Sequence, residues 1–426
     1  MATLIQAIRG MNDILPMEVD LWQMVEGMFA ECLAQYAYHE IRFPIVESTH
    51  LFKRTIGEVT DIVEKEMYTF ADLNQDSLTL RPEGTAGCVR ACLEHGLLHH
   101  LPQKLWYKGP MFRHEKPQKG RYRQFHQLGV EAFGIASFAI EVELIVIAKR
   151  LWQMLGLLPV LTLEINTLGT LEERQAYKTV LTTFLQDNAA LLDEDSKRRL
   201  NTNPLRILDS KHPNIQSLLA GAPQLTEYLT EQSLAHFQAL EQSLTALDIA
   251  YRINPFLVRG LDYYSHTVFE WTTTKLGSQA SVCAGGRFDG LIEHLGGRAM
   301  PAAGFAIGIE RLILLIKEQG TCPKELAPSL YLMSSNAAGL NRALAIAEDL
   351  RDVFPQWRIV THMLGGSFKS QFKKADKSQA DVALIIGDDE LMNQSIGIKP
   401  LRHASPQMTL PLHQLKNHLE KMFKET

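Results

Sequence analysis

The fold of this chain is decided by residues 104–134, which read KLWYKGPMFRHEKPQKGRYRQFHQLGVEAFG. Apolar and aromatic residues dominate the two ends, 104–115 and 123–134, and such runs are typical of β-strands. Lysine, glycine and arginine stand between them at 116–122, where a turn is expected. The segment therefore predicts an antiparallel β-hairpin with a mobile basic tip.

The second strand of this hairpin carries polar residues along one face. Successive side chains of a strand point to opposite faces, so Phe125, Gln127, Gly129 and Glu131 share a face. A glutamine and a glutamate with a glycine between them form a polar stripe with a gap. This pattern favours a small polar ligand over a packed core.

Arginines stand at the end and at the tip of the hairpin. Arg113 ends the first strand, and the tip adds Lys119, Arg121 and Arg123. A guanidinium group binds phosphate oxygens through two parallel hydrogen bonds. We therefore expect an anion near the hairpin, although ordinary solvated charges explain the tip residues equally well.

A second polar group stands at the entrance of another predicted strand, in RGLDYYSHTVFEW at 259–271. The strand itself should run from Thr267 to Trp271, where β-branched and aromatic residues follow one another. In front of it stand Arg259, Asp262, Tyr263 and Tyr264. Asp262 fits an orienting role and a solvent-facing turn equally well.

The stretch LRPEGTAG at 80–87 places Glu83 in a tight Pro–Gly turn that opens a helix. Thr85 is the N-cap candidate of this helix. A helix start explains the stretch by itself, and it also leaves Glu83 free to point into a site.

Two glycine-bearing segments, AGGRFDG at 284–290 and AAGFAIGIER at 302–311, let a ligand approach the backbone closely. Neither has the spacing of a P-loop or of a dinucleotide fingerprint. Arg311 begins a helix after the second segment and needs a partner, either a phosphate or a neighbouring carboxylate. The residues alone thus indicate an anion site with several arginines, and carboxylates and tyrosines for a small polar ligand.

Length and the order of predicted elements divide the chain into domains. With 426 residues, two or three domains are expected. Residues 1–325 mix strands and helices, and they include a strand-like segment at 40–48 that Pro44 confines to an edge or an interface. Within them, residues 171–247 show helical periodicity without strand signals, which indicates an inserted helical module. Residues 326–426 alternate strand and helix, as a small α/β domain with a mostly parallel sheet does.

Composition narrows the class of protein. Hydrophobic residues make up 46% and charged residues 21%, which is ordinary for a soluble enzyme, and a net charge of -5 at pH 7 confines any nucleic-acid contact to local basic patches. The N-terminus lacks the pattern of a signal peptide, and no apolar stretch approaches the roughly 20 residues that span a bilayer. We therefore expect a cytoplasmic protein without membrane contact.

The cysteines indicate reduced thiols, because their number is odd and their spacing gives no framework: Cys32, Cys88, Cys92, Cys283 and Cys322. Cys88 and Cys92 stand four residues apart on a predicted helix and could hold zinc, but no nearby His or Cys pair completes the set. We therefore expect no zinc.

Together these blocks resemble class II aminoacyl-tRNA synthetases and, within this class, the histidyl-tRNA synthetase family. The resemblance runs along the whole chain. Three segments are similar to the class motifs, the first of which forms the dimer interface: RFPIVE (42–47), MFRHEKPQKGRYRQFHQLGVEAFG (111–134) and GFAIGIER (304–311). Two more are similar to the stretches that mark the histidine enzymes: RGLDYYSHTVFEW (259–271) and AGGRFDGLI (284–292).

The resemblance implies an α/β multi-domain protein that forms a homodimer. Its catalytic domain would hold an antiparallel sheet of six or seven strands flanked by helices, and its C-terminal domain would read the anticodon. The implied reaction is ATP-dependent activation of L-histidine to histidyl-adenylate, with Mg²⁺ bridging the outer phosphates. The histidyl group is then transferred to the 3′ end of tRNA(His).

The resemblance also implies roles for the site residues. Arg113 and Arg259 would act as catalytic residues that bind the α-phosphate of ATP from opposite sides. Arg121 and Arg311 would hold the outer phosphates. Glu131 and Tyr264 would bind the two ring nitrogens of histidine. The full set that would bind histidine is Glu83, Thr85, Gln127, Glu131, Tyr263 and Tyr264.

Three other functions fit parts of the pattern. A histidyl-synthetase-like regulatory subunit of ATP phosphoribosyltransferase lacks the C-terminal domain that 326–426 indicates. A sensor of uncharged tRNA is usually embedded in a longer chain, and the presence of Arg113 and Arg259 argues against it. A class II enzyme for another amino acid is disfavoured by the pair Glu131 and Tyr264.

Overall fold

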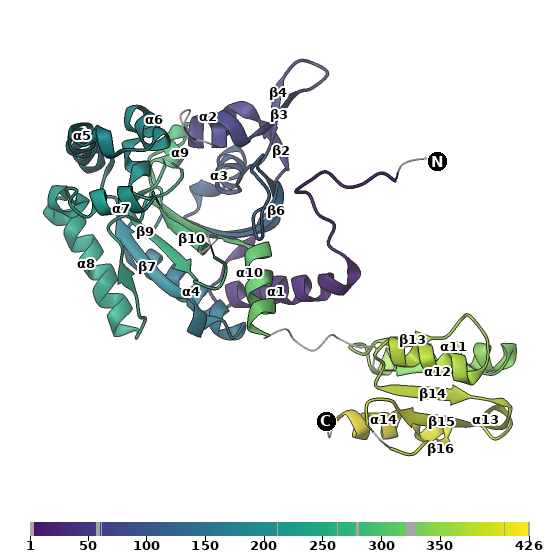
Figure 1. Cartoon of the computed structure of the whole chain (residues 1–426). Helices are drawn as coiled ribbons and strands as arrows, with labels where there is room; N and C mark the ends of the chain where they lie inside the picture. Colours follow the sequence, from purple (N-terminus) through teal and green to yellow (C-terminus); the bar gives the residue numbers. More distant parts are fainter. Residues whose placement is uncertain are drawn as a thin grey trace. The chain divides into compact units, whose positions relative to one another are not determined.

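The computed structural model describes residues 4–56, 60, 62–210, 212–261, 263–277, 281–320, 330–403 and 405–424. The chain forms two compact units, Met1–Cys322 and Pro323–Thr426, and each has its own sheet and core (Figure 1). Asp262, for which the sequence left two roles open, lies outside the described residues. Among the helices that the structure describes, none is both long and apolar enough to cross a bilayer.

The first unit is organised around one sheet of eight strands. In sheet order these are β1 (His39–Glu40), β5 (Gln103–Phe112), β6 (Gln124–Phe133), β11 (Ala302–Gly308), β10 (Ser281–Arg287), β9 (Ser265–Thr272), β7 (Thr162–Thr167) and β8 (Arg252–Ile253). The six strands from β5 to β7 are antiparallel, whereas β1 and β8 add in parallel at the two edges. The expected antiparallel sheet is therefore confirmed for its centre. The eighth strand exceeds the expected six or seven, because two-residue edge strands leave no periodic pattern in a sequence.

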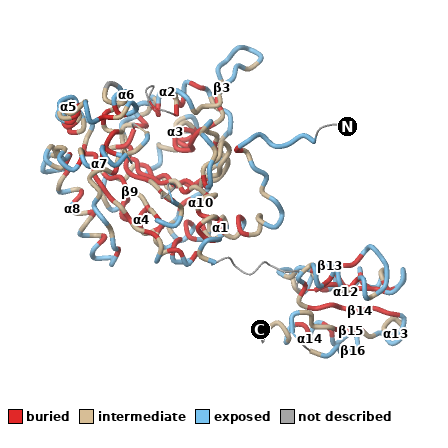
Figure 2. The backbone as a smooth tube through the Cα atoms, viewed as in Figure 1, coloured by how far each residue is buried: buried red, intermediate tan, exposed pale blue. Residues whose placement is uncertain are grey.

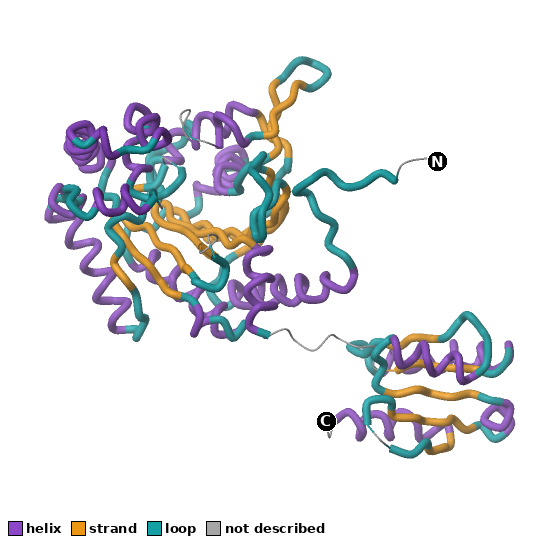
Figure 3. The backbone as a smooth tube through the Cα atoms, viewed as in Figure 1, coloured by secondary structure: helices purple, strands orange, loops and turns teal. Residues whose placement is uncertain are grey.

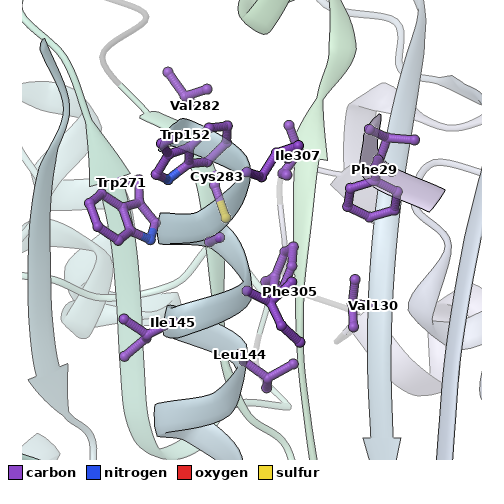
Figure 4. Packing of buried hydrophobic residues seen from close by; sticks show 14 of the residues in the cluster. Phe29, Val130, Leu144, Ile145, Trp152, Trp271, Val282, Cys283, Phe305 and Ile307 are labelled. Atoms are coloured by element: carbon purple, nitrogen blue, oxygen red, sulfur yellow. The ribbon is translucent and has the colours of Figure 1, made fainter. Parts of the chain in front are cut away.

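One face of this sheet packs against α1 (Pro16–Ala34), α4 (Ala139–Met154), α8 (Glu231–Ala246) and α10 (Ile309–Gln319). On α1 the fully buried Val25, Phe29 and Leu33 recur every four residues, the spacing of one helix face. Figure 4 shows this core, in which Trp152 of α4 meets Trp271 of β9 edge to face at 6.3 Å between ring centroids. This layer supports the sheet from behind.

The opposite face packs against α3 (Thr85–Glu94) and α9 (Leu291–His294), with α2 (Thr49–Ile56) beyond them. Phe133 of β6 and Phe288 meet edge to face in this second core. Tyr263 and Tyr264 belong to the same core. They also line the pocket described below, so packing and ligand binding share these side chains.

The described residues of the segment 171–247 form helices joined by turns and contain no strand. The elements are α5 (Leu171–Asp187), η4 (Ala189–Leu191), α6 (Glu194–Thr202), η5 (Pro204–Ile207), α7 (Pro213–Leu219), η6 (Leu225–Tyr228) and α8. Thr170 and Glu173 form a capping box that starts α5. Helices α5 and α7 join the second core, whereas Phe237 and Leu240 of α8 join the first. The segment is thus divided between the two faces of the sheet.

A small sheet of three strands, β2 (Val46–Ser48), β4 (Ser77–Leu80) and β3 (Tyr68–Ala71), stands beside the large one. The expected strand at 40–48 is interrupted, because its two ends belong to different sheets as β1 and β2. The guanidinium group of Arg81 donates to the carbonyl oxygens of Phe43 and Pro44, at 3.1 and 3.4 Å, and holds the break. The predicted edge position is confirmed for β2.

The second unit is a five-stranded sheet with helices on both faces (Figure 3). In sheet order its strands are β13 (Ile359–Thr361), β12 (Leu330–Ser334), β14 (Val382–Ile386), β15 (Ser395–Pro400) and β16 (Met408–Pro411). The helices are α11 (Ala337–Val353), α12 (Phe368–Lys377), α13 (Asp388–Met392) and α14 (Leu415–Lys424). The first three strands are parallel and the last two are antiparallel, and every residue of β14 is buried (Figure 2).

Candidate active site

A pocket of about 330 Å³ lies on the face of the large sheet that carries α3. The turn before α3, the hairpin and its tip, the loop before β9 and the start of α10 all contribute to its wall. The residues that the resemblance assigned to histidine and ATP all line this pocket: Glu83, Thr85, Arg113, Arg121, Gln127, Glu131, Arg259, Tyr263, Tyr264 and Arg311. The hairpin-tip residues Lys119 and Arg123, which the sequence also offered for an anion, do not line it. The structure thus brings the first group together, while the individual roles remain predictions.

Glu131 is the most deeply buried carboxylate of the pocket, with 1% of its surface exposed. Its Oε1 atom accepts hydrogen bonds from the Thr85 hydroxyl at 2.7 Å and from the Tyr107 hydroxyl at 3.1 Å. Among the described residues, no group donates to Oε2. Burial raises the pKa of Glu131 well above its usual value, and the nearby Glu83 acts in the same direction. A ligand that donates to Oε2 would relieve this cost.

Three glycines make room for this arrangement. A Cβ atom at Gly84 or at Gly129 would lie 2.1 Å from the ring of Tyr107. A Cβ atom at Gly304 would lie 2.0 Å from Oε2 of Glu131. The glycines therefore let the tyrosine ring and the carboxylate approach the backbone more closely than any other residue type would allow.

The turn before α3 is built on Glu83. Its carboxylate accepts the backbone N–H groups of Thr85 at 2.7 Å and of Ala86 at 2.9 Å, which are among the unpaired donors at the start of the helix. The prediction of Thr85 as N-cap is therefore wrong. Thr85 is the first helical residue, the N-cap residue is Gly84, and the Thr85 hydroxyl turns to Glu131 instead. Burial raises the pKa of Glu83, while the two backbone bonds oppose the rise.

The two tyrosines before β9 lie against each other, with ring centroids 4.8 Å apart. Both are buried, at 5% and 6% exposure. The guanidinium carbon of Arg259 lies 5.3 Å from the centre of the Tyr264 ring, a cation–π distance. The predicted neighbourhood of Arg259, Tyr263 and Tyr264 is thus present.

Arg259 is held by an acidic residue that the sequence analysis did not select. Its Nη1 atom donates to Oε1 of Glu270 at 2.6 Å, and its buried Nε has no partner among the described residues. Glu270 lies on β9 between Phe269 and Trp271, which are both buried on the other face of the sheet. A single carboxylate inside an aromatic strand was the signal that could have identified it.

Arg113 and Arg311 are anchored by backbone carbonyl groups. Arg113 donates from Nε to the carbonyl of Pro82 at 2.8 Å. Arg311 donates to the carbonyls of Gly120 at 3.1 Å and of Ser281 at 2.7 Å. Such anchors fix the direction of a guanidinium group without neutralising it.

Charges converge at the end of the pocket near the hairpin tip. Burial lowers the pKa of Arg311, and the positive charges of Arg113 and Arg121 lower it further. Arg121 pairs with Glu115, another residue that the sequence analysis did not assign to the site. Glu66, at the end of η1 (Ile62–Glu66), has its pKa raised to about 6 by burial and by the negative charge of Glu115. Several charged groups of both signs therefore lie close together at this end of the pocket without a ligand.

The described residues of this pocket include no cluster of metal-ligating side chains. In the described part of the chain, no group of three or more His, Cys, Asp or Glu residues is placed to hold a metal ion. Cys88 and Cys92 lie on α3 and are fully buried in the second core. The expected absence of zinc stays a prediction.

Comparison with known sequences adds an independent line of inference. The family model described as Histidyl-tRNA synthetase matches residues 10–312. The histidine–tRNA ligases of Legionella pneumophila strains Lens and Paris are each 56% identical to this chain over 417 residues, which cover 98% of both proteins. The similarity therefore extends through both compact units.

Comparison with solved structures gives the same fold. The apo histidyl-tRNA synthetase of S. aureus is 35% identical, with a TM-score of 0.81 over 98% of this chain and 100% of that one. The histidyl-tRNA synthetase of Nostoc sp. PCC 7120 is 18% identical, with a TM-score of 0.73 over 99% and 100%. At 18% identity the second match is evidence for the fold alone.

Proposed function

The chain belongs to the histidyl-tRNA synthetase family, and from this membership we infer that it is a histidine–tRNA ligase. It activates L-histidine with ATP and transfers the histidyl group to tRNA(His). The observation that carries this conclusion is the 56% identity to histidine–tRNA ligases along 98% of the chain. That likeness also argues against a regulatory subunit, a sensor of uncharged tRNA and an enzyme for another amino acid. We propose the cytoplasm as its location.

In the first step the carboxylate of histidine attacks the α-phosphorus of ATP and pyrophosphate leaves. The substrate is its own nucleophile, so the protein must align the reactants and stabilise the charge that develops on phosphorus. We assign this role to Arg113 and Arg259, which line one pocket although they are far apart in the sequence. A guanidinium group fixed against developing charge can supply about 3–4 kcal/mol.

Arg121 and Arg311 would hold the outer phosphates of ATP. Mg²⁺ would enter with ATP, bound chiefly by phosphate oxygens and water, as is common for this ion. The carboxylates Glu115, Glu270 and Glu310 line the pocket, but each already accepts a hydrogen bond from the protein. Bound to the phosphates, Mg²⁺ supplies positive charge that offsets their repulsion.

The histidine ring would lie against Glu131 and Tyr264. The unpartnered Oε2 of Glu131 supports this assignment, since a buried acceptor needs a donor and an imidazole N–H is one. Pockets that hydrogen-bond a polar ligand can reject analogues without the polar group by about 10⁴-fold. Tyr263 would support the ring through its contact with Tyr264.

The α-amino and carboxylate groups of histidine would be held by Glu83, Thr85 and Gln127. Gln127 has a buried side-chain oxygen without a partner among the described residues, which suits an ammonium donor. Glu83 lies at the start of α3, where its charge favours a cationic group nearby. Together these residues would direct the carboxylate toward the arginines.

We propose that the chain forms a homodimer. Large apolar side chains are exposed along the N-terminal segment, with 83% exposure at Leu4, 95% at Ile5 and 64% at Ile8. Phe70 and Leu73, in and next to β3, are exposed as well. Leu4, Ile5 and Ile8 follow closely along the chain, and an exposed apolar segment of this kind favours an interface. Light scattering coupled to size-exclusion chromatography should give twice the mass of one chain.

The second unit would bind the anticodon of tRNA(His). Lys369, Lys373 and Lys377 are exposed on α12, while Phe368 and Phe372 pack toward the sheet. The lysines and the phenylalanines therefore lie on different faces of α12. A contact made by these lysines would weaken as the salt concentration rises.

The test of the proposed function is exchange of radiolabelled pyrophosphate into ATP with each amino acid in turn. We expect exchange with histidine alone. Exchange with a different amino acid would replace the proposed substrate. No exchange at all, with a properly folded protein, would support a regulatory or sensing role.

A further inference from the structure

A turn in the chain before α1 docks on the hairpin that β5 and β6 form (Figure 1). We call residues 8–11 the N-terminal turn. The N–H of Met11 donates to the carbonyl of Ile8 at 2.8 Å and closes this turn. Gly10 is buried, whereas Ile8 and Arg9 are exposed. The turn therefore contacts the rest of the protein chiefly through its glycine.

The carbonyl group of Gly10 accepts hydrogen bonds at the point where the ladder of the hairpin ends. The last pair of this ladder is Phe112 opposite Gln124. The N–H of Arg123 donates to the Gly10 carbonyl at 2.7 Å, and the N–H of Gln124 donates to the same oxygen at 3.2 Å. Backbone N–H groups need such an acceptor when they are removed from water. The N-terminal turn therefore extends the hydrogen bonding of the hairpin at the base of its tip.

The bend at Gly10 requires glycine. Its φ angle is +87°, in the region that favours glycine over every other residue type. A Cβ atom at this position would lie 2.8 Å from Cγ of Pro117 and 3.0 Å from Cγ of Arg123. The backbone of Gly10 is thus packed against residues on both sides of the hairpin tip.

The tip has a second anchor on α10. The Nε atom of Arg311 donates to the carbonyl of Gly120 at 3.1 Å. Arg121, whose side chain lines the active-site pocket, stands in the sequence between Gly120 and Arg123. The backbone around Arg121 is therefore held by α10 on one side of it in the sequence and by Gly10 on the other.

We propose that the N-terminal turn is a positioning element of the ATP site. Through Gly10 it holds the base of the hairpin tip, and it thereby keeps Arg121 in place for the outer phosphates of ATP. A residue that is already held in its binding position costs less conformational entropy when the ligand arrives. Residues 8–11 do not line the pocket themselves, so they act through the hairpin. The role in ATP binding rests on the proposed function, whereas the docking of the turn does not.

The first arm of the test measures the docking without any substrate. Gly10→Val places a β-branched side chain at a φ angle of +87°, so the bend has to open. Hydrogen exchange followed by mass spectrometry then reports on the amides of Arg123 and Gln124. Their exchange should become about tenfold faster or more, as the loss of their acceptor predicts. Exchange at the rate of the wild type would overturn the proposal.

The matched control is Gly296→Val. Gly296 has a φ angle of +89°, almost the value at Gly10, but a Cβ atom there would meet nothing within 4 Å. It is exposed, and it lies outside the hairpin and outside the lining of the pocket. The control thus imposes the same backbone strain without touching the hairpin. It should leave the exchange of the hairpin amides and the KM for ATP as in the wild type.

The second arm measures pyrophosphate exchange. Gly10→Val should raise the KM for ATP about tenfold, the loss expected when one charged hydrogen bond is weakened. The KM for histidine should stay within about twofold of the wild type, because the residues assigned to histidine do not belong to the hairpin tip. This split separates positioning from a general loss of structure, which would affect both substrates.

Three results of the second arm would overturn the proposal. They are an unchanged KM for ATP, an equal rise of both KM values, and a changed mass of the variant in light scattering, which would trace the effect to assembly instead. A wild-type protein without histidine-dependent exchange would contradict the proposed function and with it the role in ATP binding. In that case the first arm would still decide whether the turn docks on the hairpin.

Discussion

The two ends of the active-site pocket are built on different principles. Around Glu131 the polar groups are buried, already bonded to one another and packed against glycines, so one acceptor atom is left over for a ligand. Around the arginines, positive groups are paired with carboxylates of the protein: Arg259 with Glu270, and Arg121 with Glu115. The first end is ready for its ligand, whereas the second must exchange protein partners for ligand oxygens.

This difference indicates which end of the pocket determines selectivity between ligands and which end determines the reaction rate. A preformed acceptor discriminates between ligands, because a wrong ligand leaves it unpaired in a buried place. Arginines that change partners contribute most when charge develops during the reaction. Each of the following predictions tests one side of this division.

The largest effect is expected at Glu131. Glu131→Ala should lower kcat/KM for histidine in pyrophosphate exchange by about 10⁴-fold, since the buried ring partner is lost. The KM for ATP should change little by comparison. Glu143→Ala is a suitable control, because Glu143 pairs with Lys104 outside the pocket. Parallel losses for histidine and ATP would mean that the two ends are not separate.

The next largest effect is expected at Arg259. Arg259→Ala should lower the turnover of adenylate formation by about 10²–10³-fold, with a much smaller change in histidine affinity. Single-turnover kinetics and equilibrium binding would separate the two quantities. Arg252→Ala, at an exposed arginine of β8 that does not line this pocket, should behave as the wild type. An equal loss in both quantities would contradict the assigned role.

A smaller effect of opposite sign is expected at Glu270. Glu270→Gln keeps the shape of the side chain but removes the charge that holds Arg259. The α-phosphate then competes with a weaker partner, so the KM for ATP should fall about threefold to fivefold, in line with an ion pair of modest strength. The KM for histidine serves as the internal control. A raised KM for ATP would show that Glu270 positions Arg259 for binding instead.

The smallest effect concerns pH and Glu66. Its pKa is raised to about 6, so the carboxyl group is neutral below that pH and charged above it. The added negative charge beside Arg113 and Arg121 should raise the KM for ATP by a few-fold as the pH rises through about 6. Glu66→Gln should abolish this step. Folding is affected in the same direction, since higher pH is unfavourable for both. Because the pKa of Glu66 is raised in the folded state, its carboxyl group contributes stability below its unfolded pKa, and this contribution is lost as the pH rises through the folded pKa.

Sequence patterns predicted the parts of the fold that depend on neighbouring residues. The hairpin at 104–134 was predicted because each strand is long enough to show its alternation, and β5 and β6 follow the prediction closely. The interruption of the strand at 40–48 was not predicted, because the hydrogen bonds that stabilise it come from Arg81, which is distant in sequence. The edge strands were too short to show a pattern.

The residues of the site were predicted better than the contacts between them. Residue types alone gave an anion site, and the resemblance named its members, which now line one pocket. Thr85 was misassigned as a cap because its hydroxyl finds a buried partner that no local pattern reveals. Tyr107 and Glu270 were missed for the same reason, since their importance comes from the groups that the fold places opposite them.

The glycines at 84, 129 and 304 constrain how this protein can change over generations. A Cβ atom at any of these positions would lie 2.0–2.1 Å from Tyr107 or Glu131, far inside van der Waals contact. A different residue at one of these positions therefore requires the Tyr107 ring or the Glu131 carboxylate to move, so a change of amino-acid specificity is more accessible at other lining residues such as Tyr264. The three glycines, Tyr107 and Glu131 therefore have to change together or not at all.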